Sequence, residues 1–205
     1  MLIMSANLWD ERFRQEAYVY GEAPNLFLTE QVRRLRPGSK VLCLAEGEGR
    51  NAVYLAGLGF EVTAVDGSEV AIAKARRLAE KRGVVLETIV SDLRDFEPSS
   101  SSWDAVIAIW CHLPSGLRPT VHHRIARGLR KGGVLILEHD HPAQAIDASG
   151  RRTDAEVLMN LDELRGSFSK LEPQHTFEGA REVREGLAHA GQRFVTQFVA
   201  AKTHR

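Results

Sequence analysis

Short apolar runs alternate with longer amphipathic segments along most of the chain from residue 39 onward. The apolar runs are rich in Val, Ile and Leu and predict five strands, at residues 40–44, 61–65, 84–90, 105–109 and 134–138. Nearly every position in these runs is apolar, which is typical of parallel strands that are covered on both faces. The segments between them therefore predict crossover helices and an α/β fold.

Capping residues locate several helix ends. Ser68 is a suitable N-cap for a helix over residues 70–81, and Gly83 ends it. A second helix is expected over residues 118–130, where basic residues suit the negative end of the helix dipole and the following Lys-Gly-Gly supplies a stop. The N-terminal part of the chain predicts two further helices, over residues 7–16 and 25–35.

The pattern changes after Pro142. Residues 161–168 predict a helix, whereas residues 170–184 and 192–202 predict two strands that are separated by a turn region. Two consecutive strands without a helix between them form an antiparallel hairpin, which distinguishes this fold from a pure dinucleotide-binding repeat. At 205 residues the chain can bury one substantial core, so we expect a single domain.

The charge balance argues against a polyanionic partner. Lys and Arg total 27, as do Asp and Glu, so no basic excess exists to neutralise a run of phosphates, and we expect no nucleic acid partner. No apolar stretch approaches the roughly 20 residues of a membrane span, and Asp10 and Glu11 come too early for a signal-peptide core, so we expect a cytoplasmic protein. Cys43 and Cys111 lie in apolar runs and are expected to be buried and reduced.

A glycine-rich segment, residues 46–51 (EGEGRN), follows the first strand directly, and Asp66 ends the second strand. Glycines at this place let a ligand approach the backbone, and an acid at the end of the second strand can accept both hydroxyls of a ribose. Asp92, which follows the third strand, could accept from an adenine amino group while Leu93 packs on the ring. A helix cap or a solvated loop acid is the alternative for Asp92.

Glycine spacing alone is compatible with either NAD or S-adenosylmethionine (SAM), but the charges beside the glycines separate the two. NAD would place its pyrophosphate against this turn, where the carboxylates of Glu46 and Glu48 would repel it by roughly 1–4 kcal/mol. SAM has no phosphate and carries a sulfonium and an ammonium group, which these carboxylates attract. Glu48 has a simpler alternative role, which is to favour the helix start through the dipole.

On these residues the chain resembles the class I SAM-dependent methyltransferases, and within them the small tellurite-resistance and thiopurine-methyltransferase-like group. The resemblance covers nearly the full chain. It is carried by residues 41–51 (VLCLAEGEGRN), 62–66 (VTAVD), 91–93 (SDL), 111–114 (CHLP) and 129–133 (LRKGG), with Trp9, Arg12, Phe13 and residues 20–25 (YGEAPN) in the N-terminal part.

The resemblance implies a Rossmann-like class I methyltransferase fold, with a mostly parallel seven-stranded sheet whose terminal hairpin strand is inserted antiparallel. Within one methyltransferase domain, residues 1–36 would form an N-terminal helical cap, residues 37–142 the SAM-binding core, and residues 143–205 a C-terminal helix and hairpin. The chain departs from the group at Cys43 and Ala45, where an acid and a glycine are common. This departure bears on water-mediated contacts to the amino acid part of SAM.

The resemblance also assigns parts of SAM to residues of this sequence. Glu46, Gly47 and Gly49 would hold the methionine part, Asp66 the ribose, Asp92 and Leu93 the adenine, and residues 109–112 the floor. The full set of expected cofactor-binding residues is Glu46, Gly47, Glu48, Gly49, Asn51, Asp66, Gly67, Ser68, Asp92, Leu93, Ile109, Trp110, Cys111 and His112.

Methyl transfer from a sulfonium is an in-line displacement, so the protein mainly needs to align the reactants and exclude water. A soft anionic acceptor needs no general base, whereas an alcohol or amine does. His112, His139 and His141 follow the fourth and fifth strands and are the candidate catalytic residues. His139 and His141 flank a proline turn and could instead be solvated, and His112 could line the site. Candidates for lid or substrate contacts are Trp9, Tyr18 and Tyr20, for which helix packing is an alternative, and His189 in the final hairpin.

Two other chemistries are disfavoured by the sequence. The histidine pairs 122–123 and 139/141 lack companion ligands at zinc spacing, so we expect no metal. Cys111 lies at an apolar strand end, which is a poor place to stabilise a thiolate nucleophile.

The sequence therefore predicts a SAM-dependent methyltransferase that methylates a small molecule, such as a thiol, a thiopurine-like heterocycle or a chalcogen oxyanion, and releases S-adenosylhomocysteine. We expect a monomer or a weak homodimer. Two alternatives remain open: an NAD-linked oxidoreductase, and a SAM-binding regulatory module without catalysis.

Overall fold

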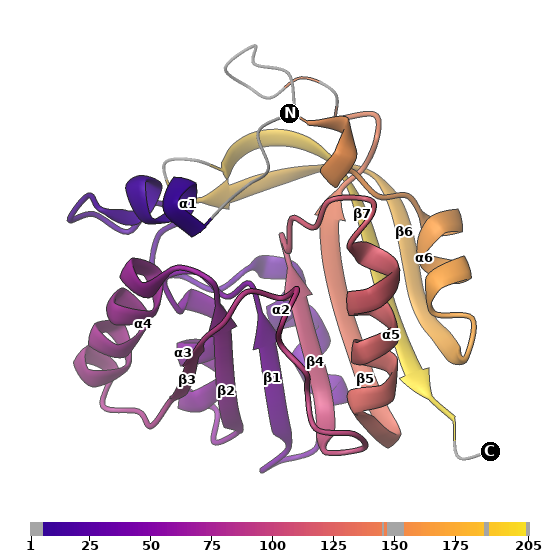
Figure 1. Ribbon diagram of the computed structural model, residues 1–205, viewed down its shortest axis with the longest axis horizontal. Coiled ribbons are helices and arrows are strands. Elements are labelled where there is room, and N and C mark those ends of the chain that lie inside the picture. The colour runs from indigo at the N-terminus through magenta and orange to yellow at the C-terminus, as the bar shows by residue number, and fades with distance from the viewer. Residues whose placement is uncertain (1–5, 145, 147–153, 187–188, 204–205) are drawn as a thin grey trace.

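The computed structural model describes residues 6–144, 146, 154–186 and 189–203. Its centre is a seven-stranded sheet with the order β3-β2-β1-β4-β5-β7-β6 (Figure 1). All pairs from β3 to β5 are parallel, and β7 is antiparallel to both of its neighbours. The predicted sheet with a terminal hairpin is therefore confirmed. The strands are β1 (Lys40–Leu44), β2 (Glu61–Asp66), β3 (Glu87–Val90), β4 (Trp103–Ile109), β5 (Leu129–Asp140), β6 (Leu171–Glu185) and β7 (His189–Lys202).

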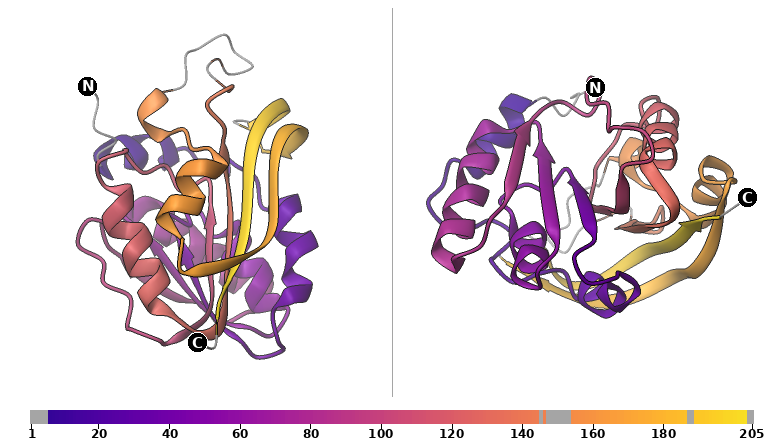
Figure 2. Two further views of the ribbon diagram at one scale, coloured as in Figure 1. Left: turned by 90° about the vertical axis from the view of Figure 1, so that its right-hand side faces the viewer. Right: turned by 90° about the horizontal axis from the view of Figure 1, so that it is seen from below.

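Helices cover both faces of the sheet (Figure 2). Because side chains alternate along a strand, Leu42 and Leu44 of β1 enter one core while Val41 and Cys43 enter the other. The first core is shared with α5 (Arg118–Gly128) and α6 (Leu161–Ser167). The second is shared with α2 (Leu26–Gln31) and α3 (Arg50–Gly57), and α4 (Glu69–Arg82) packs beside α3. The nearly all-apolar strands follow from this double coverage.

The predicted ends of α4 agree with the structure. The side chain of Ser68 accepts from the backbone N–H of Ala71 at 3.1 Å, and Gly83 takes the left-handed conformation, with φ 66°, that ends the helix.

Strand β5 differs from the prediction, because it begins at Leu129 and includes the residues expected to end α5 and to form a stop. Leu129 pairs with Trp103, and the register shifts between Trp103 and Ala105. At Gly133 a Cβ atom would lie 2.9 Å from the carbonyl oxygens of Arg130 and Trp103. The glycine therefore lets an irregular strand continue where a stop was expected.

The N-terminal segment begins with α1 (Ala6–Phe13), which lies over the carboxyl ends of the strands and beside α4 (Figure 1). Asp10 of α1 accepts hydrogen bonds from the hydroxyl of Ser68 and from the N–H of Val70 at the start of α4. The helices predicted over residues 7–16 and 25–35 are shorter in the structure, since α1 ends at Phe13 and α2 passes into the 3-10 turn η1 (Val32–Arg34). A second such turn, η2 (Ala155–Val157), precedes α6.

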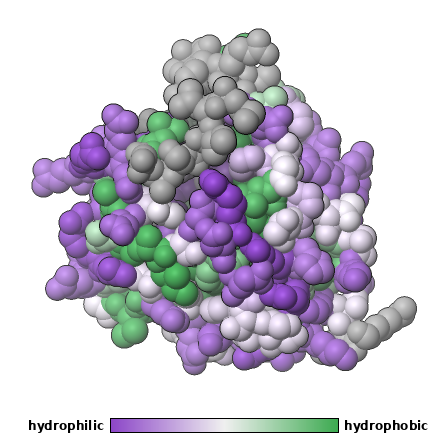
Figure 3. Space-filling model, viewed as in Figure 1, coloured by the Kyte–Doolittle hydropathy of each residue, from purple (hydrophilic) through white to green (hydrophobic). Residues whose placement is uncertain are grey.

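The surface seen from the side of Figure 1 is mostly hydrophilic, with small separate hydrophobic areas (Figure 3). None of the helices in the described part of the chain is long and apolar enough to cross a membrane.

Candidate functional site

A cavity of about 620 Å³ lies at the carboxyl ends of the parallel strands, where Trp9 and Phe13 of α1 form part of its lining. This volume lies within the range of pockets for small molecules and cofactors. Its walls come from the loops after β1, β2, β3 and β4, and from the N-terminal segment. The lining residues that the sequence analysis singled out are Trp9, Tyr20, Glu46, Gly47, Glu48, Asn51, Asp66, Gly67, Asp92, Leu93, Ile109, Trp110 and His112.

The loop after β1 approaches its neighbours closely. Gly47 and Gly49 both have positive φ, 63° and 93°, and Gly49 directly precedes α3. The N–H of Gly47 donates to the carboxylate of Asp66 at 2.8 Å, which joins the ends of β1 and β2. Gly49 does not line the cavity itself; it packs against Ala75 of α4.

Asp66 is nearly buried at the end of β2, with 9% of its surface exposed. Its two oxygens accept from the N–H groups of Gly47 and Ser68, each at 2.8 Å. Burial raises the pKa of this carboxyl, while the two backbone donors lower it. Each oxygen keeps a further lone pair, so Asp66 can still accept hydrogen bonds from a ligand in the cavity.

Glu46 is the second buried acid in the cavity wall. One of its oxygens accepts from the N–H groups of Asn51 and Ala52, at 2.9 and 2.7 Å, in the first turn of α3. Burial raises its pKa to about 7, against the lowering effect of these donors and of Arg50. Among the described residues, neither Glu46 nor Asp66 has a cationic side chain within 4.0 Å. This end of the cavity therefore favours a cationic ligand and disfavours a phosphate.

Glu48, unlike Glu46, has a cationic partner, which the loop sequence does not predict. Its carboxylate forms an ion pair with Lys74, which is 2% exposed, and accepts from the N–H of Val19 at 2.8 Å. The charge of Glu48 is thus compensated within the protein. Of the two loop acids expected to attract a cation, the structure leaves Glu46 without a cationic partner in the described part of the chain, and Asp66 lies beside it.

The loops after β3 and β4 complete the wall. Asp92 is 40% exposed at its side chain and pairs with Arg94 at 3.2 Å, and Leu93 lies next to it in the lining. Trp110 has φ 54°, an uncommon value for a bulky residue, and its indole N–H donates to Glu185 at 2.7 Å. Local strain of this kind persists where the surroundings hold it, as this buried hydrogen bond does.

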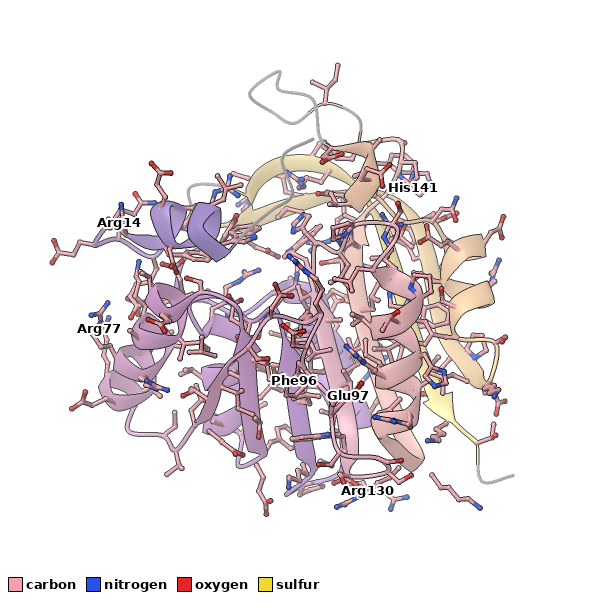
Figure 4. All side chains as sticks on the ribbon, in the orientation of Figure 1. Arg14, Arg77, Phe96, Glu97, Arg130 and His141 are labelled. Atoms are coloured by element: carbon pink, nitrogen blue, oxygen red, sulfur yellow. The ribbon has the colours of Figure 1, made fainter. Side chains whose placement is uncertain are left out.

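The three candidate histidines occupy different environments. His112 lines the cavity, with Nε2 3.9 Å from the carboxylate of Asp140. His139 is fully buried outside the lining, and burial lowers its pKa to about 3, so it stays neutral and closed to solvent. His141 also lies outside the lining, at the end of β5, where its Nε2 is 3.4 Å from Glu178 (Figure 4). Geometry therefore favours only His112 for contact with a bound molecule.

The remaining predicted residues divide in the same way. Trp9 and Tyr20 line the cavity, whereas Tyr18 lies outside the lining and its hydroxyl donates to the carbonyl of Lys74 in α4. Ser68 caps α4, and Cys111 is buried, with its pKa raised to about 12 by that burial, so its thiol stays protonated. The side chain of His189 lies outside the described part of the structure.

A buried polar network beneath the cavity was not foreseen. Asn25 donates to Glu138 and to Glu185, each at 2.7 Å, and Arg50 donates to Glu185 at 2.6 Å. Glu185 also accepts a hydrogen bond from the indole N–H of Trp110. The hairpin, the end of β4, α3 and the N-terminal segment therefore meet at this carboxylate. Asn25 and Arg50 belong to segments that carry the family resemblance, but these residues are far apart along the chain, and no local pattern predicts that they meet. Phe13 also lines the cavity, although the sequence predicts no contact with a ligand for it and includes it only among the residues that carry the family resemblance.

Residues 41–133, which include the loops after β1 to β4, match the methyltransferase domain family. Over these residues the chain is similar to a methyltransferase domain. The uncharacterised methyltransferase YbaJ of Bacillus subtilis (strain 168) is 31% identical over 100 residues, which is 48% of this chain and 39% of YbaJ. The chain spans less than half the length of the curated relatives it matches.

Solved structures share the fold of this chain. A protein studied for the conversion of a disulfide bond into a thioacetal group during echinomycin biosynthesis superposes with a TM-score of 0.76 at 20% identity, over 97% of this chain and 92% of that one. TehB from Haemophilus influenzae superposes with a TM-score of 0.71 at 19% identity, over 86% of this chain and 61% of TehB. The likenesses bear on the fold, and the match of residues 41–133 to the methyltransferase domain family supports SAM as the cofactor rather than NAD.

The residues of the cavity fit SAM. The two buried carboxylates without a cationic partner in the described chain, Glu46 and Asp66, suit a ligand with positive charge and hydroxyl donors. The same two acids would have to face the pyrophosphate of a dinucleotide, at a cost of roughly 1–4 kcal/mol for a single close contact.

Proposed function

We propose that this protein transfers a methyl group from SAM to a small-molecule acceptor that binds in the same cavity. The observation that supports this most directly is the pair of buried acids, Glu46 and Asp66, at the end of the cavity formed by β1 and β2. Bound SAM supplies an electrophilic methyl group on a positively charged sulfur.

The lining suggests how the cofactor would be held. Glu46 and Gly47 would bind the methionine part, and Asp66 would accept from the ribose hydroxyls. Asp92 would accept from the adenine amino group, while Leu93 packs against the ring. The floor would come from the end of β4, where Trp110 is fixed by Glu185, and Trp9 and Tyr20 would close the cavity from above.

The acceptor would lie on the side of the cavity formed by His112 and the loop after it. His112 is the only imidazole in the described lining. With a proton on Nε2, which faces Asp140, its Nδ1 could take a proton from an acceptor; the tautomer is inferred from this geometry. An acceptor that is already a soft anion would need no base at all. We therefore favour a thiol, a thiopurine-like heterocycle or a chalcogen oxyanion as the substrate class, and the likeness to TehB, at 19% identity, bears on the fold alone.

The proposal is tested first by calorimetry with SAM, S-adenosylhomocysteine and NAD. We expect SAM to bind with a dissociation constant near micromolar, about −8 kcal/mol, and NAD not to bind. A screen with radiolabelled SAM and thiol, selenite and tellurite acceptors then tests turnover. Binding of NAD without binding of SAM would overturn the assignment, and SAM binding without labelled product from any acceptor would favour a regulatory module.

Cofactor affinity is expected to depend on pH through Glu46. Because its pKa is about 7, the carboxyl is increasingly neutral as the pH falls, and its attraction for the ammonium group of SAM is lost. For a single group of this pKa, the dissociation constant should rise roughly eightfold between about pH 7.5 and about pH 6. Calorimetry across this range measures the change. The variant Glu46→Gln should bind SAM weakly with a nearly flat profile, and a flat profile in the wild type would contradict the role given to Glu46.

The same raised pKa affects the stability of the protein without ligand, with the opposite sign. Glu46 is protonated more readily in the folded state than in the unfolded state, so its contribution is fully present below the ordinary pKa of 4.5 and is lost as the pH rises through about 7. Ionised Glu46 thus costs stability in the ligand-free protein but binds the ammonium group of SAM. Thermal melts with and without SAM should therefore show a larger rise in melting temperature at about pH 7.5 than at about pH 6.

A further inference from the structure

A lysine is buried at the middle of α4 with its ammonium group turned toward the N-terminal segment. Lys74 is 2% exposed, and its Nζ donates to the carbonyl oxygens of Gln15 and Ala17, at 2.9 and 2.8 Å, with Phe13 at 3.4 Å. The ring of Tyr18 lies 4.9 Å from the same nitrogen. Three carbonyls of one short segment thus converge on a single cation.

The carboxylate of Glu48 completes this arrangement. It forms an ion pair with Lys74, and its Oε2 accepts from the N–H groups of Val19 and Tyr20, at 2.8 and 3.4 Å. The pair therefore contacts backbone groups at five positions between residues 13 and 20. We name residues 13–20 the strap and the Glu48–Lys74 pair the clasp.

Two aromatic side chains of the strap face the cavity. Phe13 and Tyr20 line the cavity, and Trp9, one helical turn before the strap, stacks on Phe13 with ring centroids 5.6 Å apart. Phe13 and Tyr20 meet edge to face at 6.2 Å. We call the side chains of Trp9, Phe13 and Tyr20 the aromatic roof. Because Phe13 and Tyr20 belong to the strap, which the clasp holds, the position of the roof over the cavity depends on the clasp.

We propose that Glu48 and Lys74 are positioning residues, which fasten the strap over the cavity and thereby set the affinity for the cofactor. This inference rests on the proposed function, because it takes SAM to be the molecule beneath the roof. The charge of Glu48 is compensated by Lys74 and by two backbone N–H groups, and Glu48 does not attract the cofactor directly.

The two roles of Glu48 predict opposite results for one variant. If Glu48 attracted SAM directly, removing the competing cation in Lys74→Met would tighten SAM binding. If the pair fastens the strap, the same variant weakens binding. Should the strap be in place only about a tenth of the time, the apparent dissociation constant rises about tenfold.

Because Lys74→Met leaves a buried carboxylate without its partner, this variant could fail to fold. The double variant Glu48→Gln, Lys74→Met removes both charges at similar volume, and such replacements are often neutral for stability. Lys81→Met is the matched control, since Lys81 also joins α4 to the N-terminal part, through an exposed pair with Glu22 at 2.8 Å. It should leave cofactor binding within about twofold of the wild type, as expected for a surface pair.

The experiment combines calorimetry with limited trypsin digestion of the ligand-free proteins. In the double variant we expect about tenfold weaker binding of both SAM and S-adenosylhomocysteine, with their ratio unchanged, because a mispositioned roof does not sense the sulfonium charge. Cleavage after Arg14, which lies at the outer side of the strap (Figure 4), should accelerate by about fivefold or more as the strap opens.

Two outcomes would overturn the inference. One is weaker binding of SAM but not of S-adenosylhomocysteine, with unchanged cleavage, which would assign Glu48 to the sulfonium. The other is unchanged cleavage together with unchanged affinity. If the wild type binds neither SAM nor S-adenosylhomocysteine, the proposed function fails. In that case, cleavage that is faster in the double variant but not in Lys81→Met would still show that the clasp holds the strap.

Discussion

Replacing Asp66 with alanine is expected to weaken SAM binding by roughly 1–3 kcal/mol, which is between about fivefold and about 150-fold. The carboxylate is nearly buried at the end of β2 and lines the cavity, and we propose it as the acceptor for the ribose hydroxyls. Without it, these hydroxyls would be desolvated and unpaired. Calorimetry with SAM and S-adenosylhomocysteine should show equal losses, because both carry the same ribose.

The side chain of Asp66 also organises the protein itself, and the controls must separate the two roles. It accepts from the N–H groups of Gly47 and Ser68, so Asp66→Ala should also lower the melting temperature. Asp66→Asn keeps one oxygen acceptor and should lose less affinity. Asp95→Ala removes an exposed acid on the next loop and should change neither property. An Asp66→Ala protein that is destabilised yet binds SAM as tightly as the wild type would show that Asp66 serves the fold alone.

The substitution Gly49→Ala is expected to have the largest effect on stability. Gly49 has φ 93°, and a Cβ atom there would lie 2.7 Å from Cβ and 2.8 Å from Cα of Ala75. Backbone strain of about 1–2 kcal/mol therefore adds to an overpacking cost of about 1–3 kcal/mol. For a chain of this size the sum corresponds to a fall in melting temperature on the order of 10 °C.

The chain offers a matched control for this effect at Gly59. Its φ of 85° is similar, but no atom lies within 4 Å of the Cβ position. Gly59→Ala should therefore show only the backbone strain, about 1–2 kcal/mol, and should leave SAM binding unchanged. Gly49→Ala should in addition weaken SAM binding, because separating α3 from α4 moves the loop that carries Glu46. Equal melting temperatures for the two variants would contradict the close approach of Gly49 to α4.

The alternation of apolar runs and amphipathic segments determined the parallel core and the hairpin in advance. Such patterns are local, because a strand covered on both faces must be apolar along its whole length. The glycine loop and Asp66 could also be located, since each follows directly on a predictable strand, and in a parallel sheet such ends share one edge. The start of β5 was misplaced, because Gly133 reads as a helix stop and instead permits an irregular strand.

Tertiary structure alone decided which charges remain available to a ligand. The loop sequence predicts that Glu46 and Glu48 both attract a cation, yet Glu48 is neutralised by Lys74, a residue 26 positions later that comes close only when α4 packs beside the loop. The same holds for the two histidines His112, in the loop after β4, and His139, near the end of the neighbouring strand β5, which differ in their access to the cavity. Sequence spacing places groups at an edge of the sheet, and only packing determines their partners and their burial, because these depend on residues that are distant along the chain.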